Sequence, residues 1–511
     1  MTSHPVSSFK PLFQFPQLWF RLGIVALIGF SLFLRLWGLE RFNIFVFDEV
    51  YYVKFAHNYL TQTPFFDGHP PLSKYLIALG IWLGEQVFTG AQVPRNELAG
   101  VPLSPLSYRW LNAITGTLIP LVVAGIAYQI SHRRTFALIA GVFIALDGLF
   151  LVESRYALNN VYLVLFGLLG QWLLLMALNP QVRPRSLHRF AYLLASGTFF
   201  GASIAVKWNG LWFLLGIYLI WGCAWMARLL DRHRVRSNRA LNEDEPRSQP
   251  RETQRPSIQN LTSLSLPTLL LYLGAVPVIV YSLIWIPHLK LEPMFGFWEV
   301  QNQILSYHQR VGGNEPSVHP YCSAWFTWPW MSRPVVYVYE TARNLTEIVP
   351  IKPAPPATEV RLVYDVHAMG NPYLWWFSMV ALLGLIWMLI QQWTSHLRFS
   401  PRSEASLILF TGPDLWIVIY VVLNYAASLL PWVRVTRCTF IYHYMGALVF
   451  ATLGLAWVVD RWLQGRQQWQ RLLGIAIIVV IGVAFVYWLP LFLGLPLSPE
   501  AGQNRRWLPT W

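Results

Sequence analysis

The chain has 511 residues, of which 55% are hydrophobic and only 12% are charged. A soluble domain carries about a quarter charged residues, so this composition indicates a protein that crosses a membrane many times. The net charge of +14 is compatible with nucleic-acid binding. However, the arginines cluster in short loops between apolar stretches, as membrane topology predicts. We therefore expect the lipid bilayer as a partner, and no nucleic acid.

Eleven apolar stretches approach the roughly 20 residues that a helix needs to cross a bilayer. They lie at about 21–39, 106–130, 136–152, 157–178, 190–206, 208–228, 265–287, 372–393, 413–431, 438–459 and 472–491. The arginine clusters follow even-numbered stretches, so they all lie on one side, which the positive-inside rule makes cytoplasmic. The membrane domain, 21–491, would then have a cytoplasmic N-terminus at 1–20 and an outer tail at 492–511.

Three longer segments connect these stretches. Loops 40–107 and 288–371 face outward in this topology, and a basic linker, 229–264, faces the cytoplasm. The linker is polar and poor in aromatic residues, so we assign it no chemistry. Cys223, Cys322 and Cys438 are scattered and show neither a disulfide framework nor metal-site spacing.

The first outer loop concentrates ionisable residues directly after the first apolar stretch. Asp48 and Glu49 come first, and then Asp67, His69 and Lys74 where the next apolar segment begins. An acidic pair alone is most often a solvated helix end, and the His-Pro-Pro turn alone is weak evidence. Together, groups this costly at a membrane surface indicate a functional site.

This loop resembles the first outer loop of the protein O-mannosyltransferases, which carries an Asp-Glu pair followed by a His-Pro-Pro-Leu-x-Lys turn. Other segments also resemble motifs of that family, and they spread from about residue 45 to 450: YRWLN at 108–112, ESRY at 153–156, AVKWNG at 205–210, 319–334, and RCTFIYHY at 437–444. In our topology their ionisable residues all lie at the outer face, which supports one site there.

The resemblance implies an all-α membrane protein with the GT-C glycosyltransferase fold, about eleven transmembrane helices and two long extracytoplasmic loops. It implies transfer of mannose from a polyprenyl-phosphate-mannose lipid to Ser or Thr hydroxyls of exported polypeptides, without a metal ion or cofactor. The second outer loop leaves no room for the lectin-like module of eukaryotic members, so the chain looks bacterial. We expect it in the cytoplasmic membrane with its site facing outside, and the export machinery as a further partner.

The transfer needs a base, because an acceptor hydroxyl is a poor nucleophile until its proton is removed. Asp48 is expected to be that base, and Glu49 to orient the acceptor or neighbouring groups. A retaining reaction would need a second carboxylate as nucleophile. Neighbouring helical side chains point about 100° apart, so Glu49 is a poor candidate, and we expect one inverting displacement.

The transfer also needs cations, because charge builds on the donor phosphate as the glycosidic bond breaks. Arg109 and Lys207 are expected to bind this phosphate, with Lys74 and Arg437 behind them. Arg155 could equally be an interface anchor, and His443 could equally be a packing residue at a helix start. Further candidates for substrate binding are His69, Arg155, His319, Tyr321, Tyr442 and His443.

Two alternatives belong to other functional classes. A related GT-C enzyme could transfer a lipid-linked sugar to a glycolipid, but segments 319–321 and 442–444 favour the protein mannosyltransferase. A transporter or lipid flippase would be expected to place its ionisable residues near mid-membrane. Here they collect at one face.

Overall fold

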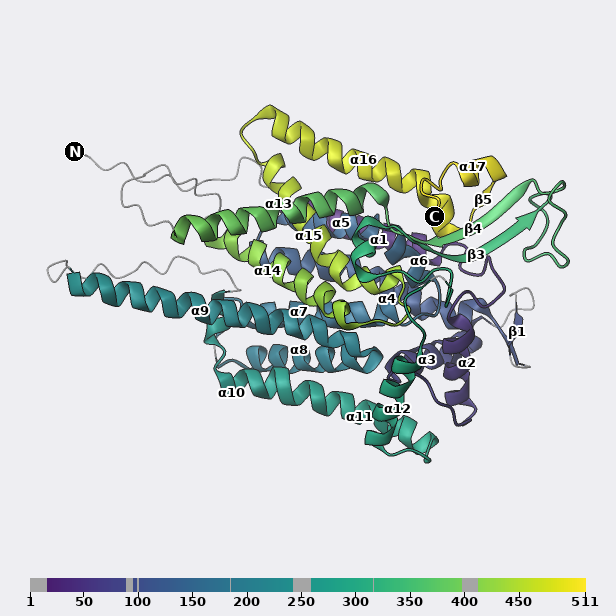
Figure 1. The fold of residues 1–511 in the computed structure, drawn as a ribbon, viewed down its shortest axis with the longest axis horizontal. Coiled ribbons are helices and arrows are strands. Elements are labelled where there is room, and N and C mark those ends of the chain that lie inside the picture. Colours follow the sequence, from purple (N-terminus) through teal and green to yellow (C-terminus); the bar gives the residue numbers. More distant parts are fainter. Residues whose placement is uncertain are drawn as a thin grey trace.

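The computed structural model describes residues 16–88, 95–98, 101–183, 185–241, 259–315, 317–397 and 412–511. Two expected cytoplasmic segments therefore fall partly outside the described residues, namely 1–15 of the N-terminus and 242–258 of the basic linker. Figure 1 shows long helices running side by side along the long axis of the molecule, with α2 and the β3–β4 pair at one end.

The helices and strands follow in chain order. They are α1 Gln17–Leu36, α2 Glu49–Leu60, α3 Leu72–Val87, β1 Asn96–Leu98, β2 Val101–Leu103, α4 Pro105–Ser131, α5 Arg134–Ala145, α6 Gly148–Arg155, α7 Asn160–Ala177, α8 Leu187–Val206, α9 Leu211–Leu241, α10 Leu266–Leu269, α11 Val276–Leu291, α12 Phe297–Arg310, β3 Val335–Ala342, β4 Leu362–Ala368, α13 Pro372–Leu397, α14 Gly412–Leu429, α15 Met445–Leu463, α16 Gln468–Leu493, β5 Pro496–Leu497 and α17 Pro499–Gln503.

Among the described residues, ten helices are long and apolar enough to cross a membrane, and counting the bent pair α5–α6 as one span gives eleven. This confirms the expected polytopic all-α architecture. The third expected span differs from the prediction, because it is bent by 59° between α5 and α6. The side chain of Asp147 accepts a hydrogen bond from the backbone N–H of Phe150 at 3.0 Å. This N-cap ends one helix and starts the next.

The two ends of the bent span lie at opposite ends of the bundle. Arg133 precedes α5 and pairs at 2.6 Å with Asp460, which lies near the C-terminus of α15. Arg155 ends α6 and donates to backbone carbonyls at the C-terminus of α1. The pair therefore crosses the bundle once despite its bend.

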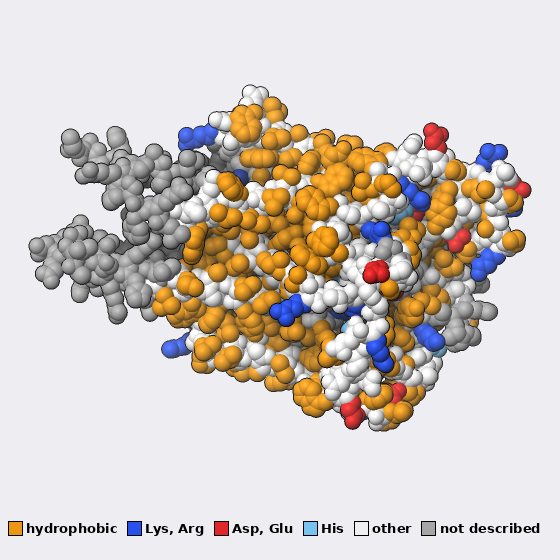
Figure 2. Space-filling model, viewed as in Figure 1, with side chains coloured by type: hydrophobic (Ala, Val, Ile, Leu, Met, Phe, Trp, Pro, Cys, Tyr) orange, Lys and Arg blue, Asp and Glu red, His pale blue; other side chains and the backbone are white. Residues whose placement is uncertain are grey.

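The core lies around α15, α7 and α4. In the most apolar part of the span at Ile441–Leu463, 89% of the residues are buried, against 17% for α1. Helices α1, α11 and α16 therefore turn most of their apolar surface outward, as helices facing lipid do. Figure 2 shows apolar side chains covering the flank of the bundle, with many of the charged side chains near the end that carries the outer loops.

The loops at 40–107 and 288–371, which the sequence predicts to face outward, cap this end of the bundle. Strand β3 pairs antiparallel with β4, and β4 pairs with β5, which follows α16. A disulfide joins Cys322 to Cys438 across 116 residues. The sequence showed no disulfide framework, because two cysteines so distant in sequence give no spacing signal. The bond ties the second outer loop to the segment that leads into α15.

Candidate active site

Two adjoining cavities lie beneath these capping loops. The Asp48 cavity has a volume of about 450 Å³ and is lined by α2, the loop before α3, α12 and residues 437–443. The arginine cavity has a volume of about 710 Å³ and lies between residues 207–212, α12 and residues 432–437. Both are lined by Gly68, His69, Lys207, His308, Val311, Arg437 and His443.

Asp48 reaches the first cavity through an unusual backbone. Phe47 has a φ of 52°, in the left-handed region that a bulky residue rarely adopts. Its ring stacks on Tyr337 at 4.5 Å and meets the edges of Phe440 and Tyr442. This packing holds a conformation that is otherwise costly, as is common at functional sites.

The carboxylate of Asp48 is available to a substrate. Asp48 occupies the N-cap position of α2, yet its side chain makes no capping hydrogen bond. Burial raises the pKa of Asp48 to about 6, against the opposing effect of nearby Lys207. A carboxyl in a cleft whose pKa lies near neutral pH is a candidate general base.

Glu49 faces away from this cavity and is fully buried. It forms a bidentate pair with Arg109, with Nε–Oε1 and Nη2–Oε2 distances of 2.9 Å and 2.7 Å. It also accepts from the backbone N–H groups of Val46 and Ala157, both at 2.8 Å. Both oxygens are thus occupied, which suits an orienting role and leaves neither oxygen of Glu49 free for catalysis.

Arg109 lines neither cavity, although it was expected to bind phosphate. Its remaining N–H groups donate to the backbone carbonyls of Leu39, Phe42 and Ile44. Together with Glu49, these contacts use all five donors of the guanidinium. We therefore revise its role: Arg109 anchors the loop between α1 and α2, on which Asp48 is carried.

Lys74 and Arg155 also act on the protein itself. The ammonium of Lys74 donates to Asp67 Oδ2 at 2.5 Å and to the carbonyls of His69 and Pro70. It lines neither cavity, and it fixes the His-Pro-Pro turn. The guanidinium of Arg155 donates to four carbonyls at the end of α1, those of Leu34, Arg35, Trp37 and Gly38. The anchor interpretation of Arg155 therefore explains its contacts.

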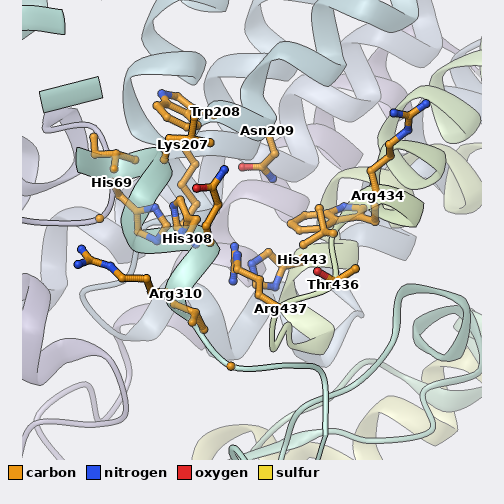
Figure 3. A pocket seen from close by; sticks show the side chains of 18 of the residues that line it. His69, Lys207, Trp208, Asn209, His308, Arg310, Arg434, Thr436, Arg437 and His443 are labelled. Carbon is orange, nitrogen blue, oxygen red and sulfur yellow. The ribbon is translucent and has the colours of Figure 1, made fainter. Parts of the chain in front are cut away.

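Lys207 and Arg437 are the expected cations that line both cavities. The ammonium of Lys207 donates to Asn160 Oδ1 at 3.0 Å and lies 5.4 Å from the ring centre of Tyr442. Burial lowers the pKa of Lys207 to about 8, while Asp48 acts in the opposite direction. Figure 3 shows both cations near His308 and His443, with Arg310 and Arg434 toward the edges of the pocket.

Three further candidates line the Asp48 cavity together with these cations. His69 lies 5.3 Å from His308, ring centre to ring centre. Burial and neighbouring cations lower the pKa of His69 well below its usual value and that of His308 to about 4. Both imidazoles are therefore neutral at pH 7 and can hydrogen-bond without adding charge. His319 and Tyr442 complete the wall.

Tyr321 and His443 take different positions. Tyr321 packs against the ring of His319 at 5.7 Å and lines neither cavity. His443 lines both cavities and also stacks on Trp328 at 5.9 Å. His443 therefore packs against an aromatic ring and also lines the cavities. Both roles that were considered from the sequence are compatible with this position.

Sequence reasoning missed several residues that the fold brings to this region. His308 and Arg310 lie on α12, and Arg434 precedes Arg437. Their segments carried no motif. Glu153 was noticed only as part of a motif, yet a glutamate directly at the end of an apolar stretch is itself a signal of function or of a buried partner.

Comparisons with known proteins identify the family of this chain. Residues 25–291 match the family model of dolichyl-phosphate-mannose-protein mannosyltransferases, and residues 293–511 match the C-terminal four-transmembrane region of protein O-mannosyltransferases. The chain belongs to the protein O-mannosyltransferase family. The resemblance inferred from the motifs is thereby confirmed.

Similar proteins align over nearly the whole length of the chain. The polyprenol-phosphate-mannose–protein mannosyltransferase of Mycolicibacterium smegmatis is 26% identical, with 99% of this chain and 95% of that protein aligned. The enzyme of the same name from Corynebacterium glutamicum is 24% identical over 91% of this chain and 88% of its own. These family members are glycosyltransferases.

The fold also matches a solved structure. The S. cerevisiae protein O-mannosyltransferase Pmt1–Pmt2 complex, bound to the sugar donor, superposes with a TM-score of 0.72 and 16% identity. The match covers 96% of this chain and 92% of the yeast chain. The expected GT-C fold is thereby confirmed.

Proposed function

We propose that this enzyme transfers mannose from polyprenyl-phosphate-mannose to Ser or Thr hydroxyls of exported proteins, at the outer face of the bacterial cytoplasmic membrane. Family membership and the names of the bacterial relatives support the donor and the protein acceptor. The observation that carries the proposal is the pair of adjoining cavities. One holds an uncommitted carboxylate and the other is cationic, and Lys207 and Arg437 line both.

The arginine cavity suits the donor phosphate. Among the described residues that line it, none is acidic, while Lys207, Arg310, Arg434 and Arg437 are basic. Fixed cations stabilise a phosphate most strongly when its charge increases in the transition state. We assign this role to Lys207 and Arg437, in place of Arg109 and Lys74, because these two reach both cavities.

The Asp48 cavity suits the acceptor. Asp48 takes the proton of the Ser or Thr hydroxyl while the oxygen attacks the anomeric carbon opposite the phosphate. The bond from that carbon to the phosphate oxygen breaks, and its electron pair leaves with the lipid phosphate. The nearby acids Glu49 and Asp67 are bound to Arg109 and Lys74. With no second free carboxylate among the described lining residues, a single inverting displacement fits best.

The outer face is the side we propose for this chemistry. Disulfides persist in oxidising compartments such as the bacterial periplasm, and the Cys322–Cys438 bond lies beside the Asp48 cavity. Polypeptides emerging from the export machinery would meet the site there. Because the proposed donor is linked to a lipid in the bilayer, transfer at this face requires no soluble nucleotide sugar there.

The test is transfer by the purified enzyme from radiolabelled mannosyl phospholipid to a synthetic Thr peptide. Label should enter the peptide and be released by an α-mannosidase but not by a β-mannosidase, since inversion of a β-linked donor gives an α product. Asp48→Asn serves as the inactive control. Label that enters only added glycolipid would reject the protein acceptor, and a β-linked product would reject inversion.

A further inference from the structure

Glu153 is a buried carboxylate that the proposed reaction does not use. It lies in α6, is fully buried and lines neither cavity. The hydroxyl of Tyr337 donates to Oε1, and the amide of Asn160 donates to Oε2 at 2.9 Å. A buried charge is costly unless it is paired or has another role, so its partners indicate what it does.

One of these partners connects Glu153 to the phosphate-binding cation. The Nδ2 of Asn160 faces the carboxylate, and its Oδ1 accepts from Lys207 Nζ at 3.0 Å. The reverse orientation of the amide would set its NH₂ against the ammonium, so the two neighbours fix it. Glu153 is thus linked to Lys207 through one side chain, that of Asn160.

The other partner connects Glu153 to the base. Tyr337 belongs to β3 in the second outer loop, and its ring stacks on Phe47 at 4.5 Å with an interplanar angle of 12°. Phe47 is the left-handed residue that precedes Asp48. The ring of Tyr337 therefore supports the backbone that precedes Asp48. Its hydroxyl holds Glu153, which is linked to Lys207 through Asn160.

We propose that Tyr337 and Glu153 are positioning residues for mannosyl transfer, which set the placement of Asp48 relative to Lys207 without touching substrate. The inference rests on the proposed function. The ring of Tyr337 positions the base through Phe47, and its hydroxyl positions Lys207 through Glu153 and Asn160. The two contributions can be separated by substitution.

The experiment compares Tyr337→Phe, Tyr337→Ala and Glu153→Gln in the peptide assay. Tyr337→Phe keeps the ring and loses the hydroxyl, so the donor KM should rise about tenfold while kcat changes little. Glu153→Gln should act in the same way. Tyr337→Ala should additionally lower kcat at least tenfold, because the ring of Phe47 loses its stacking partner. Tyr337→Phe keeps that partner and should not show this fall in kcat.

The double variant Tyr337→Phe/Glu153→Gln gives the sharper measurement. Both changes disturb the same link, since Phe lacks the donating hydroxyl and Gln has only one of the two accepting oxygens, so the double variant should be no worse than the more affected single variant. Tyr218→Phe is the control, since the hydroxyl of Tyr218, on α9, donates to the carbonyl of Leu273, which lies between α10 and α11. It should leave the donor KM unchanged and combine additively with Glu153→Gln.

Each outcome decides between the alternatives. A donor KM of Tyr337→Phe equal to that of Tyr218→Phe, or a double variant whose loss is the product of the two single losses, would overturn the inference. If Glu153→Gln does not fold, Tyr337→Phe compared with the unaltered enzyme and with Tyr337→Ala decides alone. Absence of transfer by the unaltered enzyme would reject the proposed function instead.

Discussion

Asp48 and Glu49 are chemically similar neighbours whose surroundings give them opposite roles. Asp48 faces a cavity and makes no capping hydrogen bond, whereas both oxygens of Glu49 bind Arg109 and backbone N–H groups. The difference arises from helix geometry, since adjacent side chains at the start of α2 point in different directions. Their substitutions should therefore fail in different ways.

Replacing Asp48 with Asn should remove the base and leave the fold intact. Loss of a general base costs about 10²–10⁴-fold in rate, roughly 3–5 kcal/mol in barrier height. We expect kcat to fall by this factor while protein yield and donor KM change little. Peptide mannosylation by the purified variant measures it, and turnover within a few-fold of the unaltered enzyme would remove Asp48 from the chemistry.

Replacing Arg109 with Ala should affect stability more than chemistry. The change leaves the buried carboxylate of Glu49 without its partner, and breaking a buried ion pair costs about 3–5 kcal/mol. We expect a low yield of folded protein and a lowered unfolding temperature in detergent. Lys207→Ala is the matched comparison, with a normal yield and a raised donor KM. A well-folded Arg109→Ala enzyme with a raised donor KM would restore the phosphate role to Arg109.

The pH dependence of transfer should be bell-shaped. The pKa of Asp48 is raised to about 6, and the base works only when deprotonated, so kcat/KM should fall about tenfold per pH unit below that value. The pKa of Lys207 is lowered to about 8, so above that value the cation is lost and kcat/KM should fall again. A profile that stays flat from pH 5 to 7 would contradict the assignment of Asp48.

At the scale of elements, the cavities depend on contact between distant segments. The backbone N–H of Cys438 donates to the carbonyl of Gly312, and Gly313 forms an isolated β-bridge with Arg437. The disulfide to Cys322 closes the same contact. Arg437 is therefore placed by the second outer loop and not by α15 alone.

Breaking this disulfide should weaken donor binding. We expect Cys322→Ser/Cys438→Ser, or reduction of the unaltered enzyme, to raise the donor KM several-fold because Arg437 loses its support. The double variant should then be insensitive to reductant. Cys223→Ser is the control, since this exposed cysteine is unpaired and its loss should change nothing. A full response to reductant in the double variant would place the effect elsewhere.

The same elements show what sequence can predict. The apolar stretches predicted the spans because a bilayer-crossing helix has a fixed minimum length, and the loop motifs predicted which face holds the site. Arg109 and Lys207 looked equivalent, since both stand at outer helix ends. The structure distinguishes them, because Arg109 pairs with buried Glu49 whereas Lys207 lines both cavities. The bend at Asp147 was likewise hidden, because one acid in an apolar stretch does not reveal that it caps a helix.

At the scale of the whole molecule, the arrangement of charges predicts its orientation. Thr358 is exposed in the loop between β3 and β4, and Gln467 is exposed at the start of α16. Cysteines introduced at these positions, with Cys223 replaced by Ala, can be labelled on intact cells by an impermeant maleimide. Only Thr358→Cys should react. Labelling of Gln467→Cys alone would invert the topology and the proposed site together.

The cationic lining of the arginine cavity has a consequence for turnover. A mannosyl phosphodiester carries one negative charge, whereas the polyprenyl phosphate left after transfer carries about 1.5 to 2 at pH 7. We therefore expect a cavity with basic side chains and no described acidic ones to hold the spent carrier more tightly than the fresh donor. Release of that carrier into the bilayer should then limit turnover, and the supply of acceptor polypeptides should not alone set how fast they are glycosylated.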